Sequence, residues 1–117
     1  MSDITVRKKM MRIYLGEDDE YNGQPLYHAI VLRLQELGMA GATVYKGIEG
    51  YGGQHRLRKA KTFVLSGDLP VTVVTVDAPA KIKRVLPEIA RMMKDGIIAL
   101  LEVEVVTVSG GEIVTEN

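Results

Sequence analysis

The chain has 117 residues, of which 46% are hydrophobic and 26% charged, a composition typical of one globular domain. Fifteen Lys and Arg residues balance fifteen Asp and Glu residues, and this net charge of zero disfavours nucleic acid as a partner. The absence of cysteine excludes disulfides and thiolate chemistry. No apolar run reaches the ~18 residues of a membrane span, and the N-terminus has no signal-peptide pattern. We therefore expect a single cytoplasmic domain over residues 1–117, without membrane insertion.

The first part of the chain predicts a strand, a turn and a helix. Side chains alternate over Met10–Leu15 as in a strand with one buried face. An acidic run, Glu17–Glu20, then leads to a turn at Asn22-Gly23. A helix is predicted from about Gln24 to Leu37, with Pro25 in its first turn, where the missing N–H costs nothing. The apolar stripe of this helix is Leu26, Ile30, Leu34 and Leu37.

The middle of the chain contains a second strand, Ala42–Lys46, and then a glycine-rich segment that we interpret as a long flexible loop over residues 47–62. A third strand, rich in β-branched residues, is predicted at Pro70–Asp77. Asp77 is placed to cap a second helix from about Pro79 to Lys94, which Pro87 should kink. The stripe of this helix is Ile82, Val85, Leu86, Ile89 and Met93.

The last part of the chain predicts a fourth strand at Ile97–Val106. After it, Gly110-Gly111 can turn the chain into a short strand at Ile113–Thr115, or residues 107–117 can form a frayed tail. Both alternatives stay open at this point.

The order β-α-β, loop, β-α-β predicts an α+β, ferredoxin-like split βαβ fold, with an antiparallel sheet and two helices on one face. The opposite face of the sheet would then be open and rich in apolar and aromatic side chains, which favours self-association. The residues expected on this open face are Met10, Arg12, Tyr14, Thr43, Tyr45, Thr72, Val74, Val76, Ile98 and Leu100.

The predicted loop combines glycine with positive charge. Its glycines do not match a Walker A loop or the GxGxxG spacing, so they predict either a backbone nest for phosphate or only a flexible loop. A basic run follows, which either neutralises phosphates or forms a solvated surface. The glycines are Gly47, Gly50, Gly52 and Gly53, and the run is His55, Arg56, Arg58, Lys59 and Lys61.

Three segments, Arg12–Glu17 (RIYLGE), Gly23–Leu26 (GQPL) and Thr43–Gly52 (TVYKGIEGYG), resemble a PII-like family known as domain of unknown function 190. Leu69-Pro70 and Asp95-Gly96 also fit, so the resemblance covers roughly Arg12 to Val106. The family that these segments resemble lies within the broader superfamily of PII nitrogen regulators. The resemblance implies a homotrimer that binds adenine nucleotides or related small effectors in clefts between subunits, at the base of the long loop and at the turn before the fourth strand.

On this basis we expect a regulatory protein rather than an enzyme. It should bind a small anionic effector, with an adenine nucleotide as the first candidate, and signal to an unknown protein target through the loop. The resemblance leaves open whether the effector needs Mg²⁺ and whether Tyr51 is modified. The expected effector-binding residues are Tyr45, Gly47, Gly50, Tyr51, Gly52, Gly53, His55, Arg56, Arg58, Lys94 and Gly96.

Two alternatives come from other functional classes. A ferredoxin-like metal-binding or metal-tolerance module could use Glu17–Glu20 with His28 and His55, although the acidic run lacks the ligand spacing of a calcium loop. A small enzyme could use the subunit cleft, but no nucleophile with a neighbouring base is recognisable in the sequence.

Overall fold

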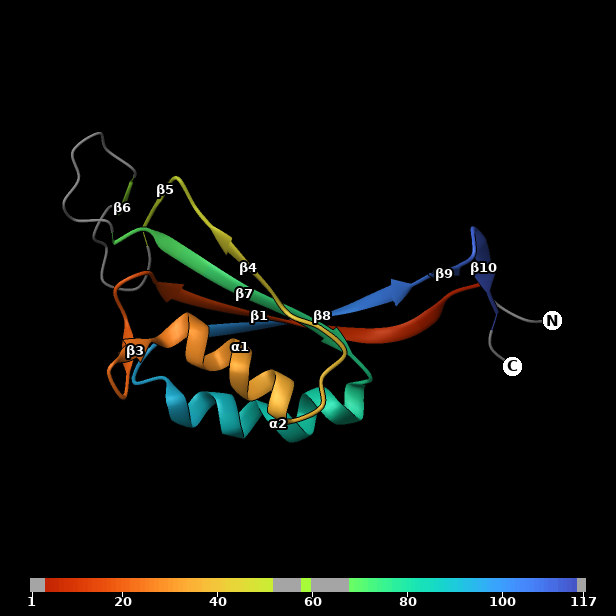
Figure 1. Cartoon of the computed structure of the whole chain (residues 1–117), viewed down its shortest axis with the longest axis horizontal. Coiled ribbons are helices and arrows are strands. Elements are labelled where there is room, and N and C mark those ends of the chain that lie inside the picture. Colours follow the sequence, from red (N-terminus) through yellow and green to blue (C-terminus); the bar gives the residue numbers. More distant parts are fainter. Residues whose placement is uncertain (1–3, 52–57, 60–67, 116–117) are drawn as a thin grey trace.

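The computed structural model describes residues 4–51, 58–59 and 68–115. Its centre is a four-stranded sheet in which each neighbouring pair of strands is antiparallel. In spatial order, the strands are β4 (Thr43–Lys46), β7 (Pro70–Asp77), β1 (Val6–Gly16) and β8 (Ile97–Val105). Both helices, α1 (Leu26–Glu36) and α2 (Pro79–Met92), cover the same face of the sheet (Figure 1). The predicted ferredoxin-like α+β fold is confirmed.

Short two-stranded ladders lie outside this sheet. They are β2 (Glu20–Tyr21) with β3 (Gln24–Pro25), β5 (Glu49–Gly50) with β6 (Arg58–Lys59), and β9 (Thr107–Ser109) with β10 (Glu112–Val114). Asn22 and Gly23 join β2 to β3 with φ angles of 49° and 81°, the left-handed backbone that a two-residue hairpin turn requires. The β5–β6 ladder lies within the predicted loop and was not indicated by the sequence.

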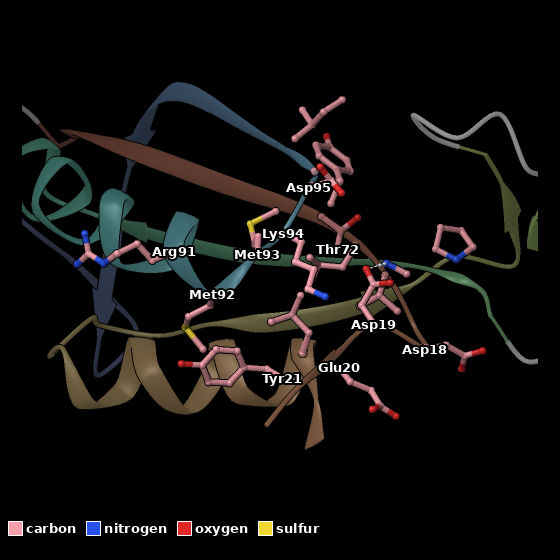
Figure 2. A pocket seen from close by; sticks show the side chains of 18 of the residues that line it. Asp18, Asp19, Glu20, Tyr21, Thr72, Arg91, Met92, Met93, Lys94 and Asp95 are labelled. Carbon is pink, nitrogen blue, oxygen red and sulfur yellow. Dashed lines mark hydrogen bonds between the residues drawn. The ribbon is translucent and has the colours of Figure 1, made fainter. Parts of the chain in front are cut away.

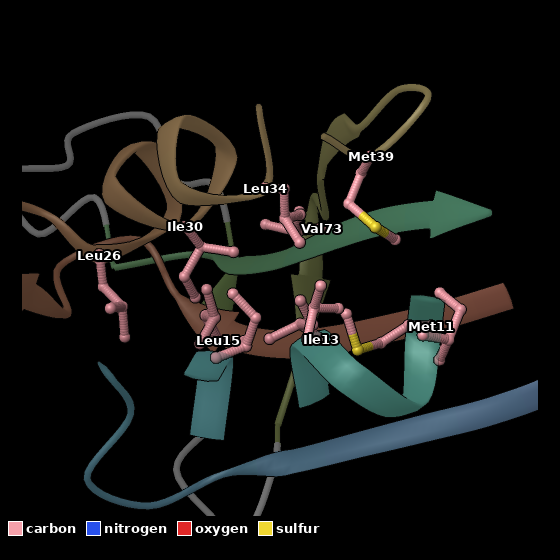
Figure 3. Close-up of a cluster of buried hydrophobic side chains, with 11 residues drawn as sticks. Met11, Ile13, Leu15, Leu26, Ile30, Leu34, Met39 and Val73 are labelled. Carbon is pink, nitrogen blue, oxygen red and sulfur yellow. The ribbon is translucent and has the colours of Figure 1, made fainter. Parts of the chain in front are cut away.

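The core lies between the helices and the covered face of the sheet (Figure 3). Met11, Ile13 and Val73 from the sheet and Ile30 and Leu34 from α1 are 0% exposed. From α2 the core takes Ile82, Val85 and Ile89. The predicted core face of the first strand and both helical stripes are therefore confirmed. Their outermost members are only partly buried at the margin of the core: Leu37, Leu86 and Met93.

The ends of the helices differ from the prediction. α1 begins at Leu26 because the residues before it pair in β3, and Pro25 occupies the N-cap position with φ −57° and ψ 131°. α2 contains Pro87 as predicted, but it ends at Met92 rather than at Lys94. No helix in the described ranges is long and apolar enough to cross a membrane.

Asp77 does not cap α2 as predicted, because Ala78 holds the N-cap position without a side-chain hydrogen bond. The Asp77 carboxylate instead accepts hydrogen bonds from the backbone N–H groups of Ala78 (2.7 Å) and Ala40 (2.9 Å). Its Oδ2 also lies 3.0 Å from Nζ of Lys81. Asp77 thus fastens the segment before β4 to the start of α2. Burial alone would raise the pKa of Asp77, but these hydrogen bonds lower it overall.

The register of β8 corrects the predicted composition of the open face. Ile98 pairs with Ile13 and Leu100 pairs with Met11. Directly paired residues of antiparallel strands project to the same face, so Ile98 and Leu100 belong to the helix-covered face, and their predicted place on the open face is wrong. The β8 residues on the open face are Ile97, Ala99 and Leu101, which pair with Tyr14, Arg12 and Met10. Alternation could not show this, because every residue from 97 to 101 is apolar.

Candidate functional site

An open cleft of about 1400 Å³ lies at the end of the sheet where β1 ends and where β7 and β8 begin. The register brings these strand ends together, because Gly16 pairs with Pro70 and Tyr14 pairs with Ile97. The cleft is lined by residues 14–16, 18–23, 70–72 and 91–97, together with Leu26 and Tyr51. Figure 2 shows the end of α2 on one side of it and the turn after β1 on the other. Segments distant in the sequence thus form one concave surface.

The turn after β1 forms one wall of the cleft and is held by hydrogen bonds of its backbone and of the Asp19 carboxylate. Asp19 Oδ2 accepts the N–H of Gly16 at 2.9 Å, and the N–H of Asp19 donates to the carbonyl of Gly16 at 3.1 Å. The carbonyl of Asp19 accepts the N–H of Leu26 at 2.7 Å, which ties the turn to the start of α1. The wall is therefore joined to the end of β1 through Gly16 and to the start of α1 through Leu26.

Charged side chains of both signs line the cleft. The cations are Lys94 and Arg91, and the acidic residues are Asp18, Asp19, Glu20 and Asp95. Arg91 lies 3.6 Å from Glu88 on α2, whereas Lys94 has no ion-pair partner among residues 4–51 and 68–115. Lys94 is thus the cation most available to an anionic ligand. Because carboxylates surround it, such a ligand also needs positive charge from elsewhere, either from other side chains or from a cation that it carries.

Two glycines allow close approaches at the margins of the cleft. The N–H of Gly47 donates to the carbonyl of Pro70 at 2.7 Å, and a Cβ on Gly47 would lie 2.8 Å from Cγ of Pro70. Gly96 has a φ angle of +152°, and a Cβ there would lie 2.6 Å from Cε of Met93. Glycine is therefore required where the chain leaves β4 and where it enters β8.

The structure brings together only part of the predicted site. Tyr51, Lys94 and Gly96 line the cleft, and Gly47 and Gly50 approach Pro70 in its wall. Tyr45 lies elsewhere, on the open face of the sheet, and is 58% exposed. Arg58 contributes its backbone to β6. Four predicted site residues lie outside the described residues: Gly52, Gly53, His55 and Arg56.

The sequence did not identify several residues of the cleft. Thr72 lies on the open face of β7 near the strand's start, Arg91 belongs to the last turn of α2, and Tyr21 lies in β2. Only the topology of the predicted fold could have indicated these residues. In the predicted fold, the turn after the first strand and the turn before the fourth must lie at the same end of the sheet.

The acidic run does not form a metal site in the structure. In the described ranges, no three His, Asp or Glu residues are grouped closely enough to hold a metal ion. Glu17 pairs instead with Lys46, at 2.6 Å between Oε2 and Nζ, and this hydrogen bond raises the pKa of Lys46. His28 is exposed on α1. The metal-binding alternative therefore finds no support in these residues.

The open face of the sheet begins beside the cleft, since Tyr14, Thr72 and Ile97 belong to both. Its large side chains are exposed in the single chain: Tyr14 is 41% exposed, Leu101 42% and Ile97 61%. Arg12 lies among them with its guanidinium 5.9 Å from the centre of the Tyr14 ring. Nε of Arg12 is buried and has no hydrogen-bond partner among the described residues. Exposed apolar surface and an unsatisfied buried donor together indicate an incomplete surface.

Comparison with protein families places residues 8–105 within the model of DUF190, described as "Uncharacterized ACR". A UPF0166 protein from Aquifex aeolicus (strain VF5) is 44% identical over 86% of this chain and 95% of its own length. Another UPF0166 protein, from Methanocaldococcus jannaschii, is 39% identical over 86% of this chain and 93% of its own length.

Among solved structures, the fold is similar to that of CPII, a nitrogen regulatory PII-like protein from Thiomonas intermedia K12. One CPII structure, bound to ADP, AMP and bicarbonate, has a TM-score of 0.59 at 12% sequence identity and covers 86% of this chain and 94% of CPII. A second, bound to ADP and bicarbonate, has a TM-score of 0.53 at 14% identity, with coverage of 86% and 90%. At this level of identity the similarity shows a shared fold.

Proposed function

This chain belongs to the DUF190 family of PII-like proteins, and we propose that it is a regulatory protein that binds an adenine nucleotide in clefts between its subunits. The observation that carries the proposal is the cleft, in which Lys94, without an ion-pair partner among the described residues, lies across from the turn after β1 and close to the start of β7 at Pro70. A PII-like protein of similar fold, CPII, binds ADP, AMP and bicarbonate, which supports ligands of this class.

Assembly into a homotrimer would complete the cleft. The exposed apolar residues of the open face continue directly into the cleft wall, so a neighbouring subunit on that face would also cover one side of the cleft. Burial of a leucine-sized side chain contributes roughly 1.5–3 kcal/mol, so several such residues favour association strongly. A neighbouring subunit also offers a source of the additional positive charge that an anion in this cleft needs.

The effector would be held by charge and by close backbone approach. Lys94, Arg56 and Arg58 would bind its phosphates, and Tyr51 or Tyr45 would stack on the base. The glycines of the predicted loop, Gly47, Gly50, Gly52 and Gly53, would admit backbone N–H groups to the phosphates, with His55 and Gly96 nearby. The loop would then engage or release a protein target in the cytoplasm.

Calorimetry with ATP, ADP and AMP, each with and without Mg²⁺, tests the proposal. Lys94→Ala should weaken nucleotide binding by about tenfold or more, because a charge-assisted hydrogen bond is worth roughly 1.5–3 kcal/mol and 1.4 kcal/mol is one decade. Lys83→Ala is the matched control: Lys83 is also an exposed lysine, on α2, but it does not line the cleft. Absence of nucleotide binding by the unaltered protein, or equal effects of the two substitutions, would contradict the proposal.

A further inference from the structure

The turn after β1 has a second side, which faces away from the cleft. Gly16, Asp18 and Asp19 line the cleft, whereas Glu17 between them does not. Glu17 instead contacts both ends of the segment that connects β4 to β7. We call these two ends the roots of the segment: residues 46–47 on the β4 side and residues 68–70 on the β7 side.

The β7-side root is held by two backbone N–H groups of the turn. The N–H of Glu17 donates to the carbonyl of Leu69 at 2.8 Å. The N–H of Asp18 donates to Oδ1 of Asp68 at 3.1 Å. Asp18 lines the cleft, and so does Pro70 at the end of this root, so a ligand on the cleft wall can contact the root directly at Pro70 as well as through Asp18.

The β4-side root is held by the side chain of Glu17. Nζ of Lys46 lies 2.6 Å from Oε2 of Glu17. The next residue, Gly47, donates its N–H to the carbonyl of Pro70 at 2.7 Å, which joins the two roots to each other. Glu17, the β4-side root and the β7-side root therefore form a closed set of contacts, and Glu17 contacts the β4-side root through its side chain and the β7-side root through its backbone.

The burial of Glu17 indicates a positioning role. Its side chain is 24% exposed, and Oε1 is buried with no hydrogen-bond partner among the described residues. A buried carboxylate oxygen without a partner is costly, and an ion pair whose lysine is 53% exposed contributes little stability in return. Stability alone therefore does not explain a carboxylate at this place.

We infer that Glu17 is a positioning residue that couples the cleft wall to both roots of the β4–β7 segment. The inference rests on the proposed function, in that it supplies the path by which an effector in the cleft acts on that segment. A ligand that fixes the turn fixes the backbone N–H of Glu17 and the direction of its side chain, and so fixes both roots. By linkage, a partner that binds the roots changes effector affinity by the same factor.

The test uses the full-length protein and amide hydrogen exchange measured at single residues. Without ligand, Glu17→Gln and Lys46→Met should each speed exchange of the Gly47 N–H, and the double variant should exchange no faster than the faster single variant, because both remove the same contact. Glu36→Gln, which removes an exposed carboxylate 3.2 Å from Arg33 on α1, should leave Gly47 unchanged. Unaltered Gly47 exchange in both Glu17→Gln and Lys46→Met would overturn the inference.

The second arm adds ADP. In the unaltered protein ADP should slow Gly47 exchange about fivefold or more, the lower end of typical couplings between sites. In Glu17→Gln, ADP should still bind within about threefold of its original affinity, since Glu17 does not line the cleft. The slowing at Gly47 should be largely lost, because only the hydrogen bond from Gly47 to Pro70 then joins this residue to the cleft wall. Retention of the slowing would overturn the coupling. If ADP does not bind the unaltered protein, the proposed function fails, and the ligand-free arm still decides whether Glu17 positions the roots.

Discussion

The two faces of one sheet differ in how completely the chain satisfies them. On the helix-covered face, Ile13 and Val73 are 0% exposed. On the open face, Tyr14, the next residue after Ile13, is 41% exposed, and Tyr45 is 58% exposed. Both faces are rich in apolar side chains, so hydrophobicity alone does not distinguish them. The difference is that two helices cover one face, whereas no helix in the described part of the chain covers the other.

Each face also carries a charged residue, and the two residues differ in how completely their polar groups are hydrogen-bonded. Asp77, on the covered face, is 6% exposed, and its carboxylate has three partners within the chain. Arg12, on the open face, has a buried Nε without a hydrogen-bond partner in the described part of the chain. A folded chain satisfies its buried polar groups, so the open face has the character of half an interface.

The largest effect should come from a charge placed on either face. Val73→Asp buries an unpaired carboxylate in the core, which costs several kcal/mol and should unfold the protein. Val74→Asp, at the next residue on the open face, should dissociate the proposed homotrimer and leave a folded monomer. Circular dichroism and light scattering separate the two outcomes. A folded, stable monomer of the unaltered protein at micromolar concentration would show that the open face needs no partner.

A smaller effect tests the register of β8. Leu101→Ala should weaken the assembly by roughly 1.5–3 kcal/mol per buried side chain, which corresponds to about one to two decades in the dissociation constant. Leu100→Ala should leave that constant unchanged, because Leu100 pairs with Met11 on the covered face. Sedimentation of both variants over a concentration series gives the comparison. The opposite result, with only Leu100→Ala dissociating, would indicate that β8 is shifted by one residue.

The smallest effect concerns the charge on the covered face, through pH. The pKa of Asp77 is lowered in the folded protein, so this residue stabilises the fold fully above its unfolded pKa of about 3.9, and the stabilisation is lost as the pH falls through the lower folded value. Asp77→Asn should reduce the free energy of unfolding by about 1–3 kcal/mol at pH 7. In urea titrations this difference should shrink below about pH 4. A difference that does not change with pH would mean that the charge of Asp77 is not involved.

The sequence was sufficient for the fold and for most of the core. Alternation predicts which side chains of β1 are buried, because every second residue of a strand points to the same face. Helical spacing predicts the buried residues of the helices in the same way, such as Ile30 and Leu34 in α1 and Ile89 in α2. The face of β8 could not be predicted in the same way, since residues 97–101 are all apolar. There the pairing with β1, a contact distant in sequence, decides the face.

The site was predictable only in part, for a similar reason. Lys94 and Gly96 follow from the family resemblance, and both line the cleft. The role of Glu17 could not be predicted, because an acidic run in a turn usually is a solvated surface and its ion pair with Lys46 depends on how β1 and β4 end relative to each other. Residues 52–57 of the predicted site lie outside the described residues, and their roles stay predictions.

The position of β1 within the sheet has a consequence for synthesis of the chain. β1 is made first, yet it lies between β7 and β8, whose residues begin at Pro70 and Ile97. At roughly 5–20 residues per second, the apolar stretch of β1 has no strand to pair with for several seconds after it leaves the ribosome. The first strand must therefore stay without a strand partner until β7 has been translated as far as Asp77, and it gains its second partner only with β8.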